Sequence, residues 1–165
     1  MDRIIRFAQP DDAPLIHRFI RALAEYEREP DAVEVGEDAL RLQMERETPP
    51  FECLLAESRG AAVGFALFFQ SYSTWKGRSG IYLEDLFVDP GRRGEGHGLA
   101  LLGRLAELAL ERDCARLEWA VLDWNEPAIR FYRSLGSQPL DEWTTHRLTG
   151  DALVRLAALS GPRRG

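Results

Sequence analysis

The sequence has no apolar run long enough to cross a membrane. A membrane-spanning helix needs about 20 consecutive apolar residues, and charged residues interrupt the apolar stretches of this 165-residue chain well before that length. The opening residues, MDRIIRFAQPDD, carry too much charge for the apolar core of a secretory signal peptide. We therefore expect a cytoplasmic protein without a membrane partner.

The chain also lacks the excess of basic residues that nucleic acids and anionic membranes attract. It has 21 Lys and Arg against 27 Asp and Glu, a formal net charge of −6. This balance argues against a nucleic-acid partner and suits a small cationic molecule better. The same charge also serves solubility, so it indicates a ligand only weakly.

Cysteine and histidine are scarce. Cys53 and Cys114 lie in apolar surroundings, with no second Cys or His at a metal-ligand spacing. The three histidines, His17, His97 and His146, are scattered along the chain. We expect buried free thiols and no metal site.

What the chain does contain is a hydrophobic content of 45%, enough for one closed core. No repeat or linker is visible, so residues 1–165 are predicted to form a single domain. Apolar periodicity, turn residues and β-branched or aromatic runs predict an α/β (α+β) domain. The expected strands are 3–8, 51–58, 62–73, 79–90, 115–124 and 142–148, and the expected helices are 10–29, 36–47, 98–113, 126–136 and 150–159.

A glycine-rich loop lies between a predicted strand and a predicted helix, in the stretch VDPGRRGEGHGLALL (88–102). It is not a Walker A phosphate loop, because Gly98 is followed by Leu and Ala rather than by Lys and Ser or Thr. A dinucleotide pattern remains open if Ala100 is its third small residue and Glu118, in a following strand, is its acidic partner. A plain connecting turn is a further alternative.

The pattern R-x-x-G-x-G, from Arg93 to Gly98, fits the loop better. Successive backbone N–H groups at the start of a helix can point at a pyrophosphate, and glycine lets phosphates approach the main chain closely. Several glycines raise the conformational entropy that the loop loses on folding, which a simple connector does not require.

The loop resembles the acetyl-CoA pyrophosphate loop of the GNAT acetyltransferase superfamily. The stretches YSTWKGRSGIYLEDLFV and WAVLDWNEPAIRFYRSLG further resemble its diamine (spermidine/spermine) N-acetyltransferase branch, and the likeness covers most of the chain from IRFAQPDD to FYRSLG. The resemblance implies a GNAT fold, with a mixed, largely antiparallel sheet of six to seven strands flanked by helices. It also implies acetyl-CoA as co-substrate and a homodimer.

Acetyl transfer to a primary amine requires a base and an acid. An amine with a pKa near 10 is neutral in only about one molecule per thousand at pH 7, and the departing thiolate leaves more easily beside a proton donor. By resemblance, Tyr132 is the candidate acid, although Phe131 and Tyr132 are also plausible core anchors. Glu84 is the candidate base, acting through water. Strand alternation places Glu84 and Asp85 on opposite faces of the sheet unless a bulge intervenes.

The resemblance also assigns the walls of the cofactor groove. In the family, the strand around LFV bends away from its neighbour, and its free main-chain groups pair with the pantetheine arm; a backbone N–H there can stabilise the oxyanion. Asn125 is equally explained as a helix N-cap. The expected cofactor-binding residues are Leu86, Phe87, Val88, Arg93, Gly94, Glu95, Gly96, His97, Gly98, Leu99, Asn125, Glu126, Pro127, Ala128 and Tyr132.

The acceptor site is expected to combine carboxylates and aromatic rings around an amine. Its predicted residues are Tyr26, Glu27, Trp75, Glu84, Asp85, Glu118 and Trp119. The hypothesis is N-acetylation of a polyamine or diamine by direct attack in a ternary complex. One alternative is an amino acid or lysine analogue such as thialysine, whose carboxyl group would need an Arg such as Arg18 or Arg78. Another is a non-catalytic acyl-CoA-binding module, which would need neither acid nor base.

Overall fold

The computed structural model describes residues 3–161. The chain forms two compact units, Met1–Leu122 and Asp123–Gly165. The first unit contains the whole sheet and the helices α1 to α3, and the second contains α4 and α5. The single domain expected from composition stays a prediction.

The first unit is built on one five-stranded sheet with the strand order β1-β2-β3-β4-β5. Strands β1 to β4 pair antiparallel, and β5 pairs parallel to β4, so the sheet is mixed and largely antiparallel as expected. The strands are β1 (Arg3–Phe7), β2 (Glu52–Ser58), β3 (Ala61–Ser73), β4 (Arg78–Val88) and β5 (Leu117–Trp119).

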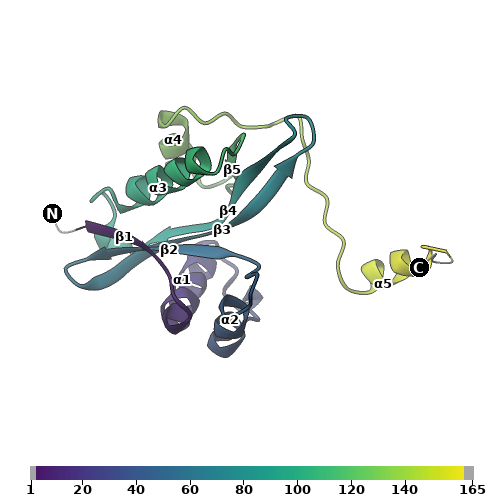
Figure 1. The fold of residues 1–165 in the computed structure, drawn as a ribbon, viewed down its shortest axis with the longest axis horizontal. Coiled ribbons are helices and arrows are strands. Elements are labelled where there is room, and N and C mark those ends of the chain that lie inside the picture. The colour runs from purple at the N-terminus through teal and green to yellow at the C-terminus, as the bar shows by residue number, and fades with distance from the viewer. Residues whose placement is uncertain (1–2, 162–165) are drawn as a thin grey trace. The chain divides into compact units, whose positions relative to one another are not determined.

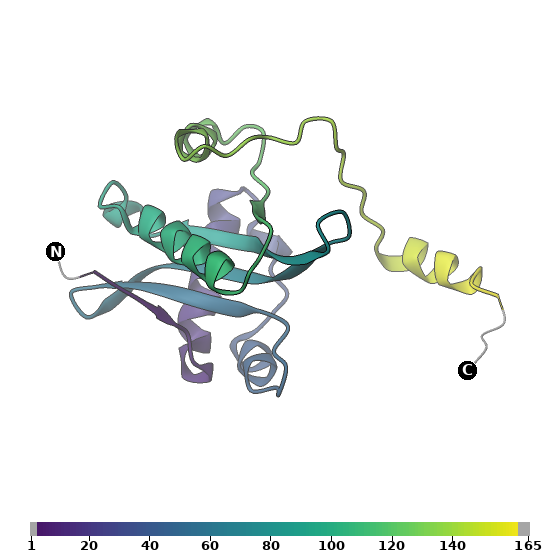
Figure 2. The same ribbon diagram turned by 45° about the horizontal axis from the view of Figure 1, so that its top comes forward.

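Helices cover both faces of this sheet (Figures 1 and 2). One face carries α1 (Ala13–Tyr26) and α2 (Glu37–Met44), and the other carries α3 (His97–Glu111). Short 3-10 turns at Pro10–Asp12, Pro30–Ala32 and Pro90–Arg92 begin with proline, whose fixed φ suits the first residue of a helical turn. Each predicted helix of this unit is present, with ends that differ by a few residues.

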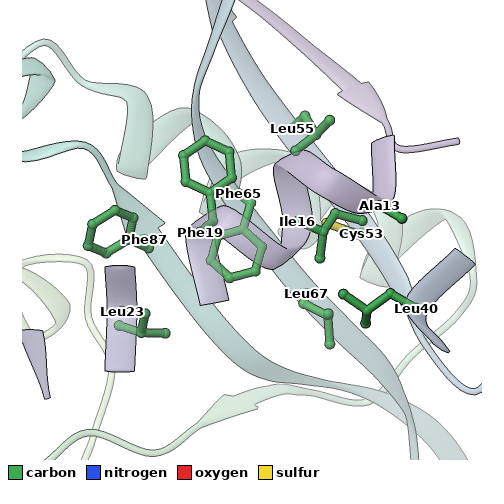
Figure 3. Packing of buried hydrophobic residues seen from close by; sticks show 10 residues of the cluster. All are labelled: Ala13, Ile16, Phe19, Leu23, Leu40, Cys53, Leu55, Phe65, Leu67 and Phe87. Carbon is green, nitrogen blue, oxygen red and sulfur yellow. The ribbon is translucent and has the colours of Figure 1, made fainter. Parts of the chain in front are cut away.

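The core under α1 follows from the helical spacing of its apolar residues. Ala13, Ile16, Phe19 and Leu23 recur every three or four residues and are all buried. Phe19 stacks on Phe65 of β3, with ring centroids 5.4 Å apart. Figure 3 shows these side chains packed against those of β2, β3 and β4. This packing fixes the end of α1 against β4.

The predicted strand at 115–124 is correct only in part, because β5 spans Leu117–Trp119 and pairs with β4 only from Ile81 to Leu83. The expected count of six to seven strands is therefore too high. A parallel pair continues only while the two backbones stay in register, and β4 changes its register immediately beyond Leu83.

The second unit holds α4 (Glu126–Ser134) and α5 (Gly150–Ala158), both predicted. The strand predicted at 142–148 is wrong: these residues are exposed and form no strand. A strand requires a neighbouring edge for its backbone hydrogen bonds, and composition alone cannot show whether such an edge is present.

Candidate active site

Strand β4 contains a β-bulge at Glu84. Leu83 lies opposite Phe68 of β3 and Asp85 lies opposite Leu67, so Glu84 has no partner residue in the β3 ladder. One extra residue on one strand shifts the alternation of everything that follows it. The bulge therefore sets the directions in which the side chains and main-chain groups of β4 point beyond Glu84.

The bulge places two neighbouring carboxylates on the same face of the sheet. Asp85 pairs with Leu67, which belongs to the core cluster under α1, so the Asp85 side chain points toward α1. Leu83 pairs with Phe68, the next residue along β3, and therefore points to the opposite face. Glu84 follows Leu83 and again faces α1. The two acidic side chains thus share one face.

Glu27, the C-cap residue of α1, completes a cluster of three carboxylates. Burial and, to a smaller extent, the negative charges of Glu84 and Glu27 together raise the pKa of Asp85 to about 7. Burial also raises the pKa of Glu27, with a contribution from Glu84. Each charge disfavours ionisation of its neighbours. A cation bound among these groups would relieve that repulsion.

The bulge also turns backbone groups of β4 toward an open edge. Before it, the Ile81 N–H points toward β5 and donates to the Arg116 carbonyl (3.0 Å). After it, the Asp89 N–H points the other way and donates to the Val63 carbonyl (2.8 Å). Backbone direction alternates along a strand, so Leu86 and Val88 face the β5 side, where the ladder has already ended at Leu83. Of the three residues expected to pair with pantetheine through their main chain, Leu86 and Val88 face this edge, whereas Phe87 lies opposite Phe65 in the ladder with β3.

The glycine loop follows directly from this edge. Gly94 and Gly96 have φ values of 79° and 80°, in the left-handed region that glycine adopts without strain. A Cβ at Gly94 would meet no atom within 4 Å, and α3 begins at His97. An open, glycine-lined turn ahead of a helix N-terminus fits a pyrophosphate group.

Charged side chains connect the loop to the start of α3 and to strands β1 and β2. Glu95 pairs with His97 Nε2 (3.1 Å) and accepts a hydrogen bond from Arg92 Nε (3.0 Å), and these contacts lower the pKa of Glu95. The Arg3 guanidinium donates to the Glu95 carbonyl. Arg92 also donates to Ser58 Oγ at 2.7 Å, which ties the loop to β2.

The other predicted acceptor residues of the first unit are distributed along the sheet. Glu118 pairs with Arg116 and lies beside Tyr82, whose pKa is raised by burial and then by the charges of Glu84 and Glu118. Trp119 is the last residue of β5. Trp75 lies at the tip of the β3–β4 hairpin, 90% exposed and separate from the carboxylate cluster.

The remaining predicted residues belong to the second unit. Asn125 occupies the N-cap position of α4, and Glu126, Pro127 and Ala128 form its first turn. Tyr132 follows one turn after Ala128, so the two share a face of the helix. The rings of Phe131 and Tyr132 have centroids 5.6 Å apart. Their assignment to a cofactor groove stays a prediction.

Two residues near these groups were not anticipated from the sequence. Tyr82 could have been found, because it lies two residues before Glu84 on the same strand face. Arg3 carries no local signal, since its contact with Glu95 joins residues 92 positions apart.

Comparisons with known proteins show the family of the chain. The sequence model of the Acetyltransferase (GNAT) family matches residues 16–136. The chain is 45% identical over 165 residues to a thialysine N-epsilon-acetyltransferase of Bos taurus, covering 93% of this chain and 96% of that one. The chain belongs to the GNAT acetyltransferase family. It is therefore an acetyl-CoA-dependent N-acetyltransferase.

The chain is also similar to one further curated protein and to a solved structure. The chain is 33% identical over 163 residues to a human spermidine/spermine N(1)-acetyltransferase-like protein 1, across 93% of this chain but 23% of that protein. Its fold matches an integron cassette protein from the mobile metagenome of V. cholerae, with a TM-score of 0.78, 28% identity and coverage of 95% and 98% of the two chains.

Neither a metal-binding group nor a membrane-spanning helix is found in the described part of the chain. Residues 3–161 contain no cluster of three or more His, Cys, Asp or Glu side chains suited to a metal ion. Within the same range, no helix is both long and apolar enough to cross a bilayer.

The glycine loop generates a first prediction. Gly96→Val should raise the Kd for acetyl-CoA at least about tenfold, because a β-branched residue resists a φ of 80° and its Cβ would lie 3.1 Å from the Arg3 guanidinium. Gly91→Ala is the matched control, since a Cβ there meets nothing within 4 Å. Titration calorimetry should show weaker acetyl-CoA binding by the Gly96→Val variant and unchanged binding by the Gly91→Ala variant. Equal affinities in two folded variants would contradict the loop's role.

Asp85 generates a second prediction, about pH. Its pKa rises from 3.8 to about 7 on folding, so the folded protein binds this proton more tightly and stability falls as pH rises between those values. Asp85→Asn removes that loss. At pH 8 the free energy of unfolding of the variant should exceed that of the wild type by about 1–2 kcal/mol, and near pH 4 the two should differ little. The difference is smaller than the full pKa shift would give, because Asp85 is partly exposed. Urea unfolding at both pH values measures the difference. A gain in the free energy of unfolding that does not change with pH would show that folding does not raise the pKa of Asp85.

Proposed function

We propose that this protein acetylates the side-chain amine of a lysine-like amino acid, of which thialysine is the reference compound. The observation that carries an amine acceptor is the carboxylate cluster, in which the bulge places Glu84 and Asp85 on one face of the sheet, near Glu27 at the end of α1. The 45% identity to a thialysine N-epsilon-acetyltransferase over nearly its whole length supports an amino-acid acceptor. The spermidine/spermine N(1)-acetyltransferase-like relative is matched over only 23% of its length.

In the proposed mechanism, the ammonium group enters among the three carboxylates and loses a proton before it attacks. Glu84, the most exposed of the sheet carboxylates, is the proposed base and accepts the proton through water. The neutral nitrogen attacks the thioester carbonyl directly, so a C–N bond forms and the C–S bond breaks. A backbone N–H at the open β4 edge stabilises the oxyanion. As the C–S bond breaks, the nitrogen releases its second proton to water, and Tyr132 is the proposed acid that protonates the departing thiolate.

A polyamine acceptor is the second candidate, because a cluster of carboxylates by itself selects cations. An amino acid also carries a carboxyl group that calls for a positive partner. The two arginines considered from the sequence are already engaged: Arg18 contacts Asp89 (3.4 Å) and the Ala62 carbonyl (3.1 Å), and Arg78 pairs with Asp113. Either would have to share or exchange these contacts to bind the acceptor's carboxylate.

A homodimer is also proposed, as the family resemblance implies. The second unit supports it, because Leu140, Trp143, Val154 and Leu159 are exposed there. A helix as short as α5 is marginally stable without packing. The proposed compartment is the cytoplasm, where free thiols such as Cys53 and Cys114 stay reduced.

An acceptor panel tests the proposed function. With acetyl-CoA in excess, thiol release should proceed with a kcat/KM about tenfold higher for thialysine than for spermidine or putrescine, because the site discriminates through polar groups that the wrong acceptor leaves unpaired. Boiled enzyme and acceptor-free reactions are the controls. Faster turnover of the polyamines would support the second candidate. Binding of CoA without turnover of any amine would identify a non-catalytic acyl-CoA-binding module.

The proposed acid generates a separate prediction. Tyr132→Phe keeps the aromatic ring and removes only the phenolic proton, so kcat should fall roughly 10- to 1000-fold while the Kd for acetyl-CoA changes little. Steady-state kinetics with the best acceptor of the panel and calorimetry with acetyl-CoA measure the two effects. Wild-type turnover would assign Tyr132 a packing role.

A further inference from the structure

The side chain of Arg93, the first residue of the R-x-x-G-x-G loop, makes its contacts outside that loop. Its Nε donates to the Val88 carbonyl at 3.2 Å, and its guanidinium carbon lies 4.8 Å from the centre of the Tyr26 ring and 5.6 Å from that of Phe87. A cation within about 6 Å of an aromatic ring centre is attracted by the ring's negative face. The side chain is therefore held by two aromatic rings and one backbone carbonyl.

These contacts join two ends of the site that are far apart in sequence. Arg93 is the first residue of the R-x-x-G-x-G loop, whereas Tyr26 is the last residue of α1 and directly precedes Glu27 of the carboxylate cluster. The Val88 carbonyl lies on the open edge of β4. One side chain thus touches the loop's entry, the open edge and the end of α1.

The anchoring matters because the loop beyond Arg93 has little intrinsic stiffness. Gly94 and Gly96 both adopt left-handed conformations and lack side chains that would restrict the unbound loop. Fixing the first residue of such a loop lowers the entropy that a ligand must remove when it binds. A change at the Tyr26 ring should therefore alter the mobility of the glycine loop.

We propose that Arg93 is a positioning residue that couples the cofactor loop to the acceptor end of the site through the Tyr26 ring. The proposal rests on the proposed function only in taking the Glu27 end as the place where the amine binds. A ring displaced at Tyr26 loosens the loop, and a loop fixed by the cofactor in turn fixes Tyr26. Linkage makes such coupling reciprocal.

Calorimetric titration of the full-length protein with CoA tests the coupling without any acceptor. Tyr26→Leu should raise the Kd for CoA about two- to fivefold, the range expected for loss of one exposed cation–π contact. Tyr26→Phe retains the ring and should keep the wild-type Kd. Tyr72→Leu, which removes an exposed tyrosine from the β3–β4 hairpin, is the matched control and should also keep it. Thermal unfolding of each variant checks that the fold is intact.

A double-mutant cycle separates coupling from general damage. Arg93→Gln should weaken CoA binding, and adding Tyr26→Leu to it should cause no further loss, because the contact is already broken. Additive losses, or equal losses in Tyr26→Phe and Tyr26→Leu, would overturn the proposal. If the cycle behaves as expected but no amine is acetylated, the proposed function fails and the coupling stands. If amines are acetylated and the losses are additive, only the coupling fails.

Discussion

The arrangement of the site depends on one extra residue in β4. Without the bulge at Glu84, Glu84 and Asp85 would point to opposite faces, and the main-chain groups of Leu86 and Val88 would face β3. With it, both carboxylates face α1 and these main-chain groups face an edge where the β5 ladder has ended. The acidic end and the proposed cofactor end of the site thus arise from the same local irregularity.

The bulge brings an electrostatic consequence. Three carboxylates share one region, and burial together with mutual repulsion holds the pKa of Asp85 near neutrality. Such a cluster destabilises the unliganded protein at neutral pH and favours a cationic ligand. At the other end, Arg3, Arg92 and His97 surround Glu95 and hold the glycine loop against the sheet. The same strand thus leads from an acidic cluster to a loop suited to phosphates.

Sequence patterns were sufficient for the local features. The 3.6-residue spacing of Ile16, Phe19 and Leu23 predicts α1, and the glycines between a strand and a helix predict the loop, because both signals lie within one element. The family resemblance then supplied the mixed, largely antiparallel sheet. The expected strand at 142–148 failed because a strand needs a neighbouring edge that composition does not reveal.

The long-range features were beyond the sequence alone. Strand alternation predicts opposite faces for Glu84 and Asp85 unless a bulge intervenes. The bulge depends on the register with β3, which the sequence of β4 alone does not reveal. The contacts of Arg3 with Glu95 and of Arg93 with Tyr26 join distant segments that only the folded sheet brings together.

Amide hydrogen exchange along β4 tests the central claim most directly. In the free protein, the N–H groups of Asp85 and Phe87 bond to β3 and should exchange slowly, while those of Leu86 and Val88 face the open edge and should exchange fast. Acetyl-CoA should then protect Leu86 and Val88 and change Asp85 and Phe87 little. Equal protection of all four amides in the free protein, or no added protection with acetyl-CoA, would contradict the account of the bulge and the edge it opens.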